Sequence, residues 1–190
     1  MGAATRSTKQ RMLDSAVLLL RERGAAGVTV DAVLAHSGAP RGSVYHHFPG
    51  GRNEIILGAV RLAGDFIATM VDQSVAEGDA RRTVERIGRF WKKALTSTDY
   101  RAGCPVVAMA VDSREHLPDA AELVREIFAR WQASLSELLS ANGFPAQRAR
   151  RLATLIVSSI EGAIILCRAQ GDLKPLDDVL AELTSLLGER

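Results

Sequence analysis

The sequence has few cysteines and no pattern typical of β-strands. Two cysteines occur in 190 residues, Cys104 and Cys167, and neither lies in a CxxC or other metal-ligand spacing. A disulfide scaffold and a cysteine-based zinc site are therefore excluded, and both residues are interpreted as buried, reduced thiols of a cytoplasmic protein. No run of residues alternates between apolar and polar side chains, so nothing predicts a sheet.

Signals for secretion, membrane insertion and lipidation are also missing. The apolar run at residues 16–20 is too short for a signal peptide and is followed at once by Arg21. The most apolar segment, 152–167, is shorter than a membrane span and contains Glu161. The chain has Arg6 where myristoylation requires serine or threonine. We therefore expect a cytoplasmic protein with no membrane partner.

The residue patterns that support catalysis are missing as well. The chain contains no nucleophile elbow, no glycine-rich phosphate loop and no pair of carboxylates beside a candidate base. His46 and His47 are adjacent, so on a helix their side chains point about 100° apart, and no other ligand lies near them in the sequence. We expect no enzyme activity, no cofactor and no metal.

Basic residues are concentrated at the N-terminal end. Residues 1–52 carry seven Lys/Arg and three Asp/Glu, a net charge of +4, whereas residues 53–190 carry 17 and 19, a net charge of −2. This asymmetry favours a polyanionic partner for the N-terminal segment. A hydrophobic content of 47% and a charged content of 24% are those of a soluble globular protein.

Apolar residues recur at helical spacing along the chain, which predicts an all-α fold. A first helix follows Ser7, which has Gln10 in capping-box spacing, and a second runs from Val30 to Ser37. A third helix is expected to have Pro40 in its first turn. We expect these three short helices to form one domain, residues 1–51, and a larger helical body to form a second, residues 52–190. The body helices are predicted at residues 52–76, 79–95 and 106–111, in a long segment around 124–138, and at 145–170 and 175–187.

The stretch APRGSVYHHF, residues 39–48, predicts a helix-turn-helix, because two short helices flank a tight turn that contains glycine. Val44 and Phe48, four residues apart, share one face and are expected in the core. The remaining side chains are left for solvent or for the DNA major groove. Arg41 suits guanine O6 and N7 or a phosphate, and Tyr45 suits a phosphate or a thymine methyl. The alternative is an ordinary solvated helix face.

The segment TVDAVLAHSGAPRGSVYHHF resembles the DNA-binding segment of the TetR family of bacterial transcriptional repressors, and the first helix also matches the family pattern. The resemblance covers residues 8–60. It implies groove and backbone contacts from Arg41, Gly42, Ser43, Tyr45, His46 and His47. It implies phosphate contacts from Thr29, which also begins the second helix, and from Arg52. The connection FPGGRNE is one residue longer than is usual in the family, which weakens the assignment of Arg52.

Beyond residue 100, GCPVVAMAVD, IEGAIILCRAQGD and PLDDVL are similar to a branch of the family that responds to multidrug-type compounds or flavonoids. This implies an effector pocket in the body. The expected lining residues are Phe66, Met70, Trp91, Met109, Phe128, Trp131, Glu161 and Ile164. The aromatic residues are first of all core residues, and bordering a cavity is a second role for them. Glu161 is the only charged residue in 152–167, so it either forms a salt bridge, across a dimer interface or to a neighbouring helix, or recognises the ligand.

Residues 152–167 are apolar on more than one helix face, with Leu155, Ile156, Ile160 and Ile164 assigned to one side and Val157 and Ile165 to another. A homodimer through the helices 145–170 and 175–187 explains both faces. The resulting hypothesis is a homodimeric repressor that binds a palindromic double-stranded DNA operator and is released by a small apolar or aromatic effector, which shifts the helix 52–76. The alternatives are a helical small-molecule carrier that does not use DNA and an enzyme whose site is not recognised.

Overall fold

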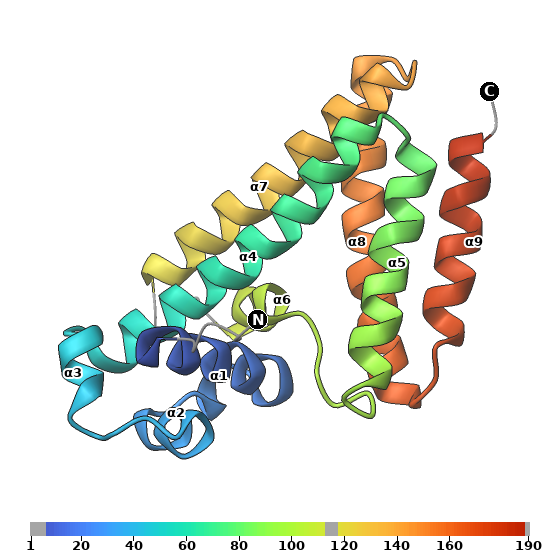
Figure 1. Ribbon diagram of the computed structural model, residues 1–190. Helices are drawn as coiled ribbons and strands as arrows, with labels where there is room; N and C mark the ends of the chain where they lie inside the picture. Colours follow the sequence, from blue (N-terminus) through green and yellow to red (C-terminus); the bar gives the residue numbers. More distant parts are fainter. Residues whose placement is uncertain (1–6, 113–117, 189–190) are drawn as a thin grey trace, which may run out of the picture. The chain divides into compact units, whose positions relative to one another are not determined.

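The computed structural model describes residues 7–112 and 118–188, and every regular element in those ranges is helical, as predicted (Figure 1). The predicted helices are all present, with ends that differ by one or a few residues. In chain order the elements are α1 (Thr8–Arg23), the 3-10 turn η1 (Ala25–Gly27), α2 (Val30–Ser37), α3 (Ser43–His47), α4 (Gly51–Glu77), α5 (Ala80–Thr96), α6 (Pro105–Asp112), α7 (Pro118–Ala141), α8 (Ala146–Gln170) and α9 (Lys174–Gly188).

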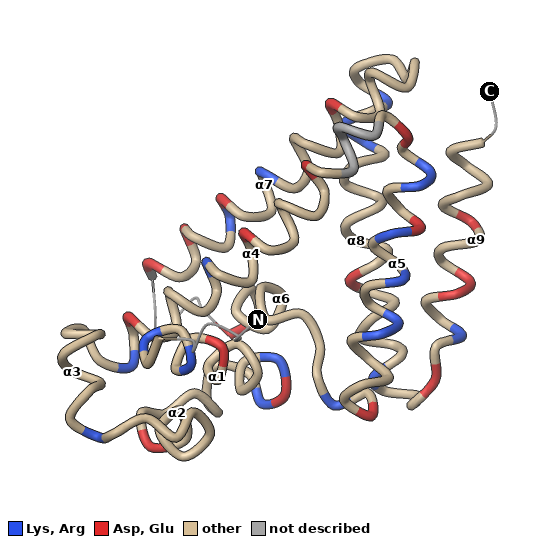
Figure 2. The backbone as a smooth tube through the Cα atoms, viewed as in Figure 1, with Lys and Arg blue, Asp and Glu red and all other residues tan. Residues whose placement is uncertain are grey.

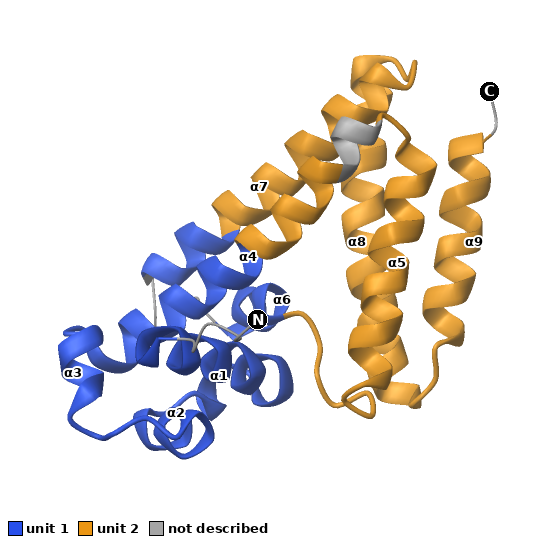
Figure 3. Ribbon diagram, viewed as in Figure 1, with its two compact units in different colours: residues 1–64, 105–124 blue, residues 65–104, 125–190 orange. Residues whose placement is uncertain are grey.

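The chain forms two compact units, coloured separately in Figure 3. Unit 1 comprises residues 1–64 and 105–124, and unit 2 comprises residues 65–104 and 125–190. The helices α4 and α7 each contribute residues to both units. The division into a DNA-binding domain of residues 1–51 and a body of residues 52–190 stays a prediction.

Unit 1 is built around α1, which packs on α2 and on α6. The Ser7 hydroxyl caps α1 by accepting a hydrogen bond from Gln10 N at 3.2 Å. The return bond of a capping box is not made, because the Gln10 side chain instead donates to Asp14 Oδ1 at 2.9 Å. The core of unit 1 contains Met12, Ala16, Leu20, Val33, Val44, Phe48, Ile55, Ile56, Val106 and Met109.

Unit 2 contains α5, α8 and α9 packed on one another (Figure 1). α5 and α9 approach closely at Gly88, where an added Cβ would lie 2.4 Å from Leu180 Cδ1. The part of α7 in this unit is tied to α4, because Arg130 donates to Asp65 at 3.0 Å and to Asp72 at 3.3 Å. The core of unit 2 contains Val84, Ile87, Trp91, Leu95, Trp131, Leu135, Ile156, Ile160, Ile164, Leu176, Leu183 and Leu187.

Candidate DNA interface and effector site

The turn between α2 and α3 is held by local hydrogen bonds. The Thr29 hydroxyl caps α2 by accepting from Ala32 N at 3.0 Å. Gly38 ends α2 in the left-handed conformation, with φ 64°, and its N–H donates to Leu34 O at 3.0 Å. A side chain at position 38 would be strained at this φ, so the glycine sets the direction in which the chain leaves α2.

The start of α3 differs from the prediction. Pro40 was expected in the first turn of the helix, but α3 begins at Ser43. Residues 40–43 form a turn in which Ser43 donates twice to Pro40 O, from N at 3.0 Å and from Oγ at 2.6 Å. The Pro40 carbonyl is thus already satisfied by the i to i+3 bond of this turn, before a full helical turn is complete.

One face of α3 is buried and the other is exposed, as the sequence predicted. Val44 and Phe48 are 0% and 2% exposed and belong to the core of unit 1. Tyr45 is 67% exposed, and Arg41, Gly42 and His46 are exposed as well. Ser43 and His47 are partly exposed, and the rings of His46 and His47 lie 4.8 Å apart. The segment 41–47 therefore offers hydroxyl, imidazole and guanidinium groups on one short surface, which we call the reader surface.

Arg41 has a partner that the sequence did not predict. Its guanidinium Nη2 donates to Asp31 Oδ1, and the two side chains are 80% and 76% exposed. Asp31 lies in the first turn of α2, where the positive end of the helix dipole stabilises a carboxylate. Ten residues separate the pair in sequence, so no helical spacing could have predicted it.

Arg52 is bound within unit 1. Its Nε donates to Val28 O at 2.7 Å and its Nη2 to Ala25 O at 2.6 Å. These bonds join the start of α4 to the loop between α1 and α2, and the side chain is only partly exposed. Nothing in the sequence predicted this role. A phosphate contact from the remaining N–H groups of Arg52 stays a prediction, as does one from the exposed Thr29.

A second link in unit 1 involves α6. Asp112 Oδ2 accepts a hydrogen bond from Ala25 N at 3.1 Å. An added Cβ on Gly24, which has φ 68°, would lie 2.9 Å from the same oxygen. The last residue of α6 thus satisfies a backbone group at the end of α1.

The expected effector residues are divided between the units. Met109 is buried in unit 1, and the other seven lie in unit 2. Trp91 and Trp131 are buried core residues, as the aromatic residues were first interpreted, and Ile164 is buried as well, whereas Phe66 is 55% exposed. Aromatic rings meet in pairs: Phe66 and Phe90 have centroids 5.3 Å apart, and Phe128 and Trp131 also 5.3 Å. A role for these residues in binding an effector stays a prediction.

Glu161 is the unusual member of the set. Its carboxyl is buried, and desolvation raises its pKa from 4.5 to about 7, although a hydrogen bond from the Cys104 thiol acts in the opposite direction. The Oε2 atom has no hydrogen-bond partner among the described residues. The predicted salt bridge to a neighbouring helix is therefore not formed within the described part of unit 2.

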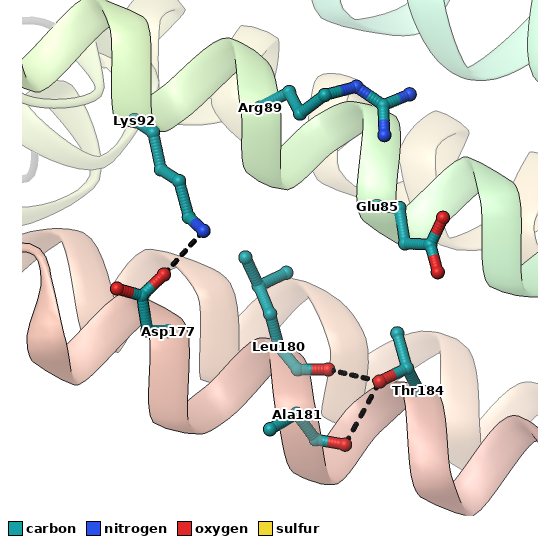
Figure 4. Close-up of a pocket in the computed structure, with 7 residues that line it drawn as sticks. All are labelled: Glu85, Arg89, Lys92, Asp177, Leu180, Ala181 and Thr184. Atoms are coloured by element: carbon teal, nitrogen blue, oxygen red, sulfur yellow. Dashed lines mark hydrogen bonds and ion pairs between the residues drawn. The ribbon is translucent and has the colours of Figure 1, made fainter.

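Two surface grooves lie in unit 2. The first, of about 340 Å³, lies between α5 and α9, with Glu85, Arg89 and Lys92 facing Leu180 and Thr184, and with an ion pair from Lys92 to Asp177 (Figure 4). Figure 2 shows that most charged residues of α5 are basic and that most charged residues of α9 are acidic. The second groove, of about 690 Å³, has small and polar residues of α7 on one side and Ala146, Arg150 and Thr154 of α8 on the other. None of the eight expected effector residues lines either groove.

By length and composition, α8 is apolar enough to cross a membrane, and among the described residues it is the one helix that passes this test. The central helix of a soluble protein passes it too. The helix Ala146–Gln170 is longer than the apolar segment 152–167, because it also includes Arg148, Arg150 and Arg151 before that segment and Arg168 after it.

The comparisons with known proteins agree with this architecture. The model of the "Bacterial regulatory proteins, tetR family" matches residues 12–59, and that of the "Transcriptional regulator LmrA/YxaF-like, C-terminal domain" matches residues 80–182. An uncharacterized HTH-type transcriptional regulator of Mycobacterium tuberculosis is 42% identical over 184 residues, which cover 94% of this chain and 93% of the relative. The HTH-type transcriptional regulator LmrA of Bacillus subtilis is 25% identical over 181 residues, covering 95% and 96%.

Solved structures show the same fold. The regulatory protein TetR from Rhodobacter sphaeroides has a TM-score of 0.83 at 20% identity, with 94% of this chain and 97% of that chain covered. A TetR regulator from Legionella pneumophila also has a TM-score of 0.83, at 22% identity, covering 97% and 99%. A short helix-turn-helix followed by a helical body defines a transcriptional regulator of the helix-turn-helix class. The chain belongs to the TetR family, and its body matches the LmrA/YxaF-like group. This family is a class of regulators and not of enzymes.

Removing the Arg52 guanidinium tests its structural role. Arg52→Ala is expected to lower the free energy of unfolding by about 2–3 kcal/mol, because two partly buried hydrogen bonds from a charged group are lost. Urea unfolding followed by circular dichroism measures the change. Arg61→Ala, which removes an exposed arginine from the same helix, is expected to change the value by less than about 0.5 kcal/mol. Equal stabilities for the two variants would show that the Arg52 bonds do not hold the α1–α2 loop.

The buried Glu161 makes stability depend on pH. Its pKa is about 7 in the folded chain and 4.5 ordinarily, so the folded state holds the proton more tightly. The wild-type protein therefore loses stability as the pH rises from about 4.5 to 7, by at most about 3 kcal/mol. Glu161→Gln lacks this loss and is expected to become progressively more stable than wild type over that range. Unfolding curves from pH 4 to pH 8 measure it, and Glu182→Gln controls for an exposed carboxylate. A constant difference between Glu161→Gln and wild type would contradict the burial of an ionisable carboxyl.

Proposed function

We propose that the chain is a ligand-responsive transcriptional repressor that binds a palindromic operator as a homodimer and leaves it when a small apolar effector binds. The observation that carries the proposal is the reader surface, because Val44 of α3 and the following Phe48 are buried while Tyr45 and its polar neighbours are exposed. A helix of this kind fits the major groove, and its N-terminal residues meet base edges there. A protein that acts on the chromosome works in the bacterial cytoplasm.

The reader surface supports both kinds of DNA contact. Arg41, Ser43 and Tyr45 precede or begin α3, where base edges come within reach. Thr29 stands at the start of α2, where free N–H groups and the helix dipole favour a phosphate. The net charge of +4 on residues 1–52 gives the long-range attraction.

A homodimer is supported by the outer face of α8. Leu155, Ile165 and Leu166 are 43%, 53% and 50% exposed, although the helix also buries Ile156, Ile160 and Ile164. Leu155 thus belongs with the outer residues and not with Ile156, as the sequence analysis had assigned it, because a spacing of eleven residues brings 155 and 166 onto one face.

Two further observations support pairing through this face. Ser158 and Gly162 lie between the outer apolar residues and leave room for a close helix approach. Exposed apolar residues in such a stripe are typical of a protein–protein contact. A dimer also places two reader surfaces on the two half-sites of a palindrome.

The effector proposal rests on unit 2. Paired aromatic rings around Trp91 and Trp131 suit flat apolar molecules, and the unpartnered Oε2 of Glu161 offers a buried acceptor to a ligand donor. Cys104, which donates to Glu161, immediately precedes α6, and Asp112 at the other end of α6 holds the α1–α2 junction. We propose that effector binding acts on the reader through α4, which runs through both units, and through α6. Effector and DNA then weaken each other's binding by an equal factor.

Selection of bound duplexes from a random DNA pool tests the DNA-binding function. The effector-free protein is expected to enrich a palindrome, and Tyr45→Ala is expected to lose the enrichment while staying folded, because the Tyr45 side chain is 67% exposed and does not belong to the core. If each protomer neutralises three or four phosphates, the logarithm of affinity falls with the logarithm of salt concentration at a slope of about −6. Folded protein that enriches nothing would favour the carrier that binds small molecules without DNA.

The dimer is tested by placing charge on the outer face of α8. Ile165→Lys combined with Leu166→Lys is expected to yield a monomer, because two lysines on each side would bring like charges into an apolar contact. Light scattering after size-exclusion chromatography measures the mass, and the variant is expected to lose affinity for the full palindrome. The control is Val111→Lys on α6, which replaces another exposed apolar residue. Persistence of the dimer in the double variant would place the interface elsewhere.

A further inference from the structure

Among the described residues, the reader surface takes part in one ion pair, that of Arg41 with Asp31, which joins α2 to the turn before α3. Asp31 is fixed on α2, whereas Arg41 lies on the turn before α3. Only Nη2 of the guanidinium bonds to the carboxylate, so its remaining N–H groups are available. Both side chains are largely exposed, and a pair of this kind contributes little to stability. The pair therefore matters mainly for the position and the charge of the Arg41 guanidinium.

An unpaired arginine at this position would be attracted first to phosphates, which carry the charge of DNA. A carboxylate beside it has two effects. The carboxylate offsets the positive charge of the guanidinium, which weakens the attraction of Arg41 to phosphates. The carboxylate is also itself repelled by phosphates. A base edge is different, because guanine O6 and N7 accept from the guanidinium fork without carrying a full charge, and a neighbouring cytosine N4 can donate to a carboxylate.

We propose that Asp31 is a positioning residue that directs the Arg41 guanidinium to a guanine edge in the operator and away from the phosphate backbone. The inference rests on the proposed DNA-binding function and adds to it a specificity determinant on α2. It assigns one G·C pair in each half-site to Arg41, with the Arg41–Asp31 bond kept in the complex.

The experiment compares wild type with Asp31→Asn, Asp31→Glu, Arg41→Ala and the double variant Asp31→Asn with Arg41→Ala. Each protein is used to select duplexes from a random pool. Affinities are then measured against the selected operator, against its single-base variants and over a range of salt concentrations. Glu22→Gln on α1 is the control, because it changes the charge of unit 1 equally without touching Arg41.

Wild type is expected to prefer guanine at one position of each half-site. Arg41→Ala and Asp31→Asn should each reduce that preference by about tenfold or more. Asp31→Asn should also steepen the salt dependence by about one unit per protomer, since Arg41 then becomes free to neutralise a phosphate. Asp31→Glu should keep most of the preference. In the Arg41→Ala background, Asp31→Asn should change the preference at that position no further.

Tighter binding of every duplex by Asp31→Asn, with the guanine preference unchanged, would overturn the inference, since Asp31 would then act only as a negative charge near DNA. A preference that Glu22→Gln alters as strongly as Asp31→Asn would overturn it as well. Failure of wild type to select any duplex would instead contradict the proposed function on which the inference rests.

Discussion

The reader surface depends on the burial of two side chains, Val44 and Phe48. A helix of five residues is too short to be stable alone in water, because nucleation costs more than one turn of hydrogen bonds returns. α3 persists because its rear face is part of the core of unit 1, where both side chains are almost fully inaccessible. Each such side chain contributes roughly 1.5–3 kcal/mol on burial. The exposed side chains of Tyr45 and His46 are therefore not needed to fill the core.

The loops around α2 and α3 are held by polar groups that bond to backbone atoms. Thr29 caps α2, Arg52 binds two carbonyls of the α1–α2 loop, and Asp112 binds Ala25 N. Each satisfies a backbone group that a short helix leaves open at its ends. These bonds hold the loop before α2, in the same unit as the reader surface. Arg52 is the clearest case, because the resemblance to the TetR family implied only a phosphate contact, and the structure adds two hydrogen bonds from its guanidinium to backbone carbonyls.

Much of this fold could be predicted from the sequence because its signals are local. Periodic apolar residues and Gly38 fixed the helices of unit 1, and the i, i+4 spacing of Val44 and Phe48 fixed the buried side of α3. The remainder depends on how helices lie against one another. Nothing local brings Asp31 to Arg41, and nothing local groups α6 with the N-terminal helices. Leu155 was assigned to the wrong face because residues 155 and 156 border two apolar stripes, and periodicity alone does not say which one a neighbouring helix covers.

Glu161 and α8 show how one helix can serve two requirements. One face supplies the core of unit 2 through Ile156, Ile160 and Ile164, and the opposite face leaves Leu155 and Leu166 exposed. The carboxyl of Glu161 is buried, no cation among the described residues pairs with it, and the ionised form is disfavoured there. A structural role would be met as well by an apolar residue of similar size, which would carry no desolvation cost. A buried acceptor that lowers stability near neutral pH is understandable if a ligand donor completes it, since binding then recovers the free energy that the unpartnered oxygen costs. The Glu161 side chain would then affect both the stability of the fold and the recognition of the effector.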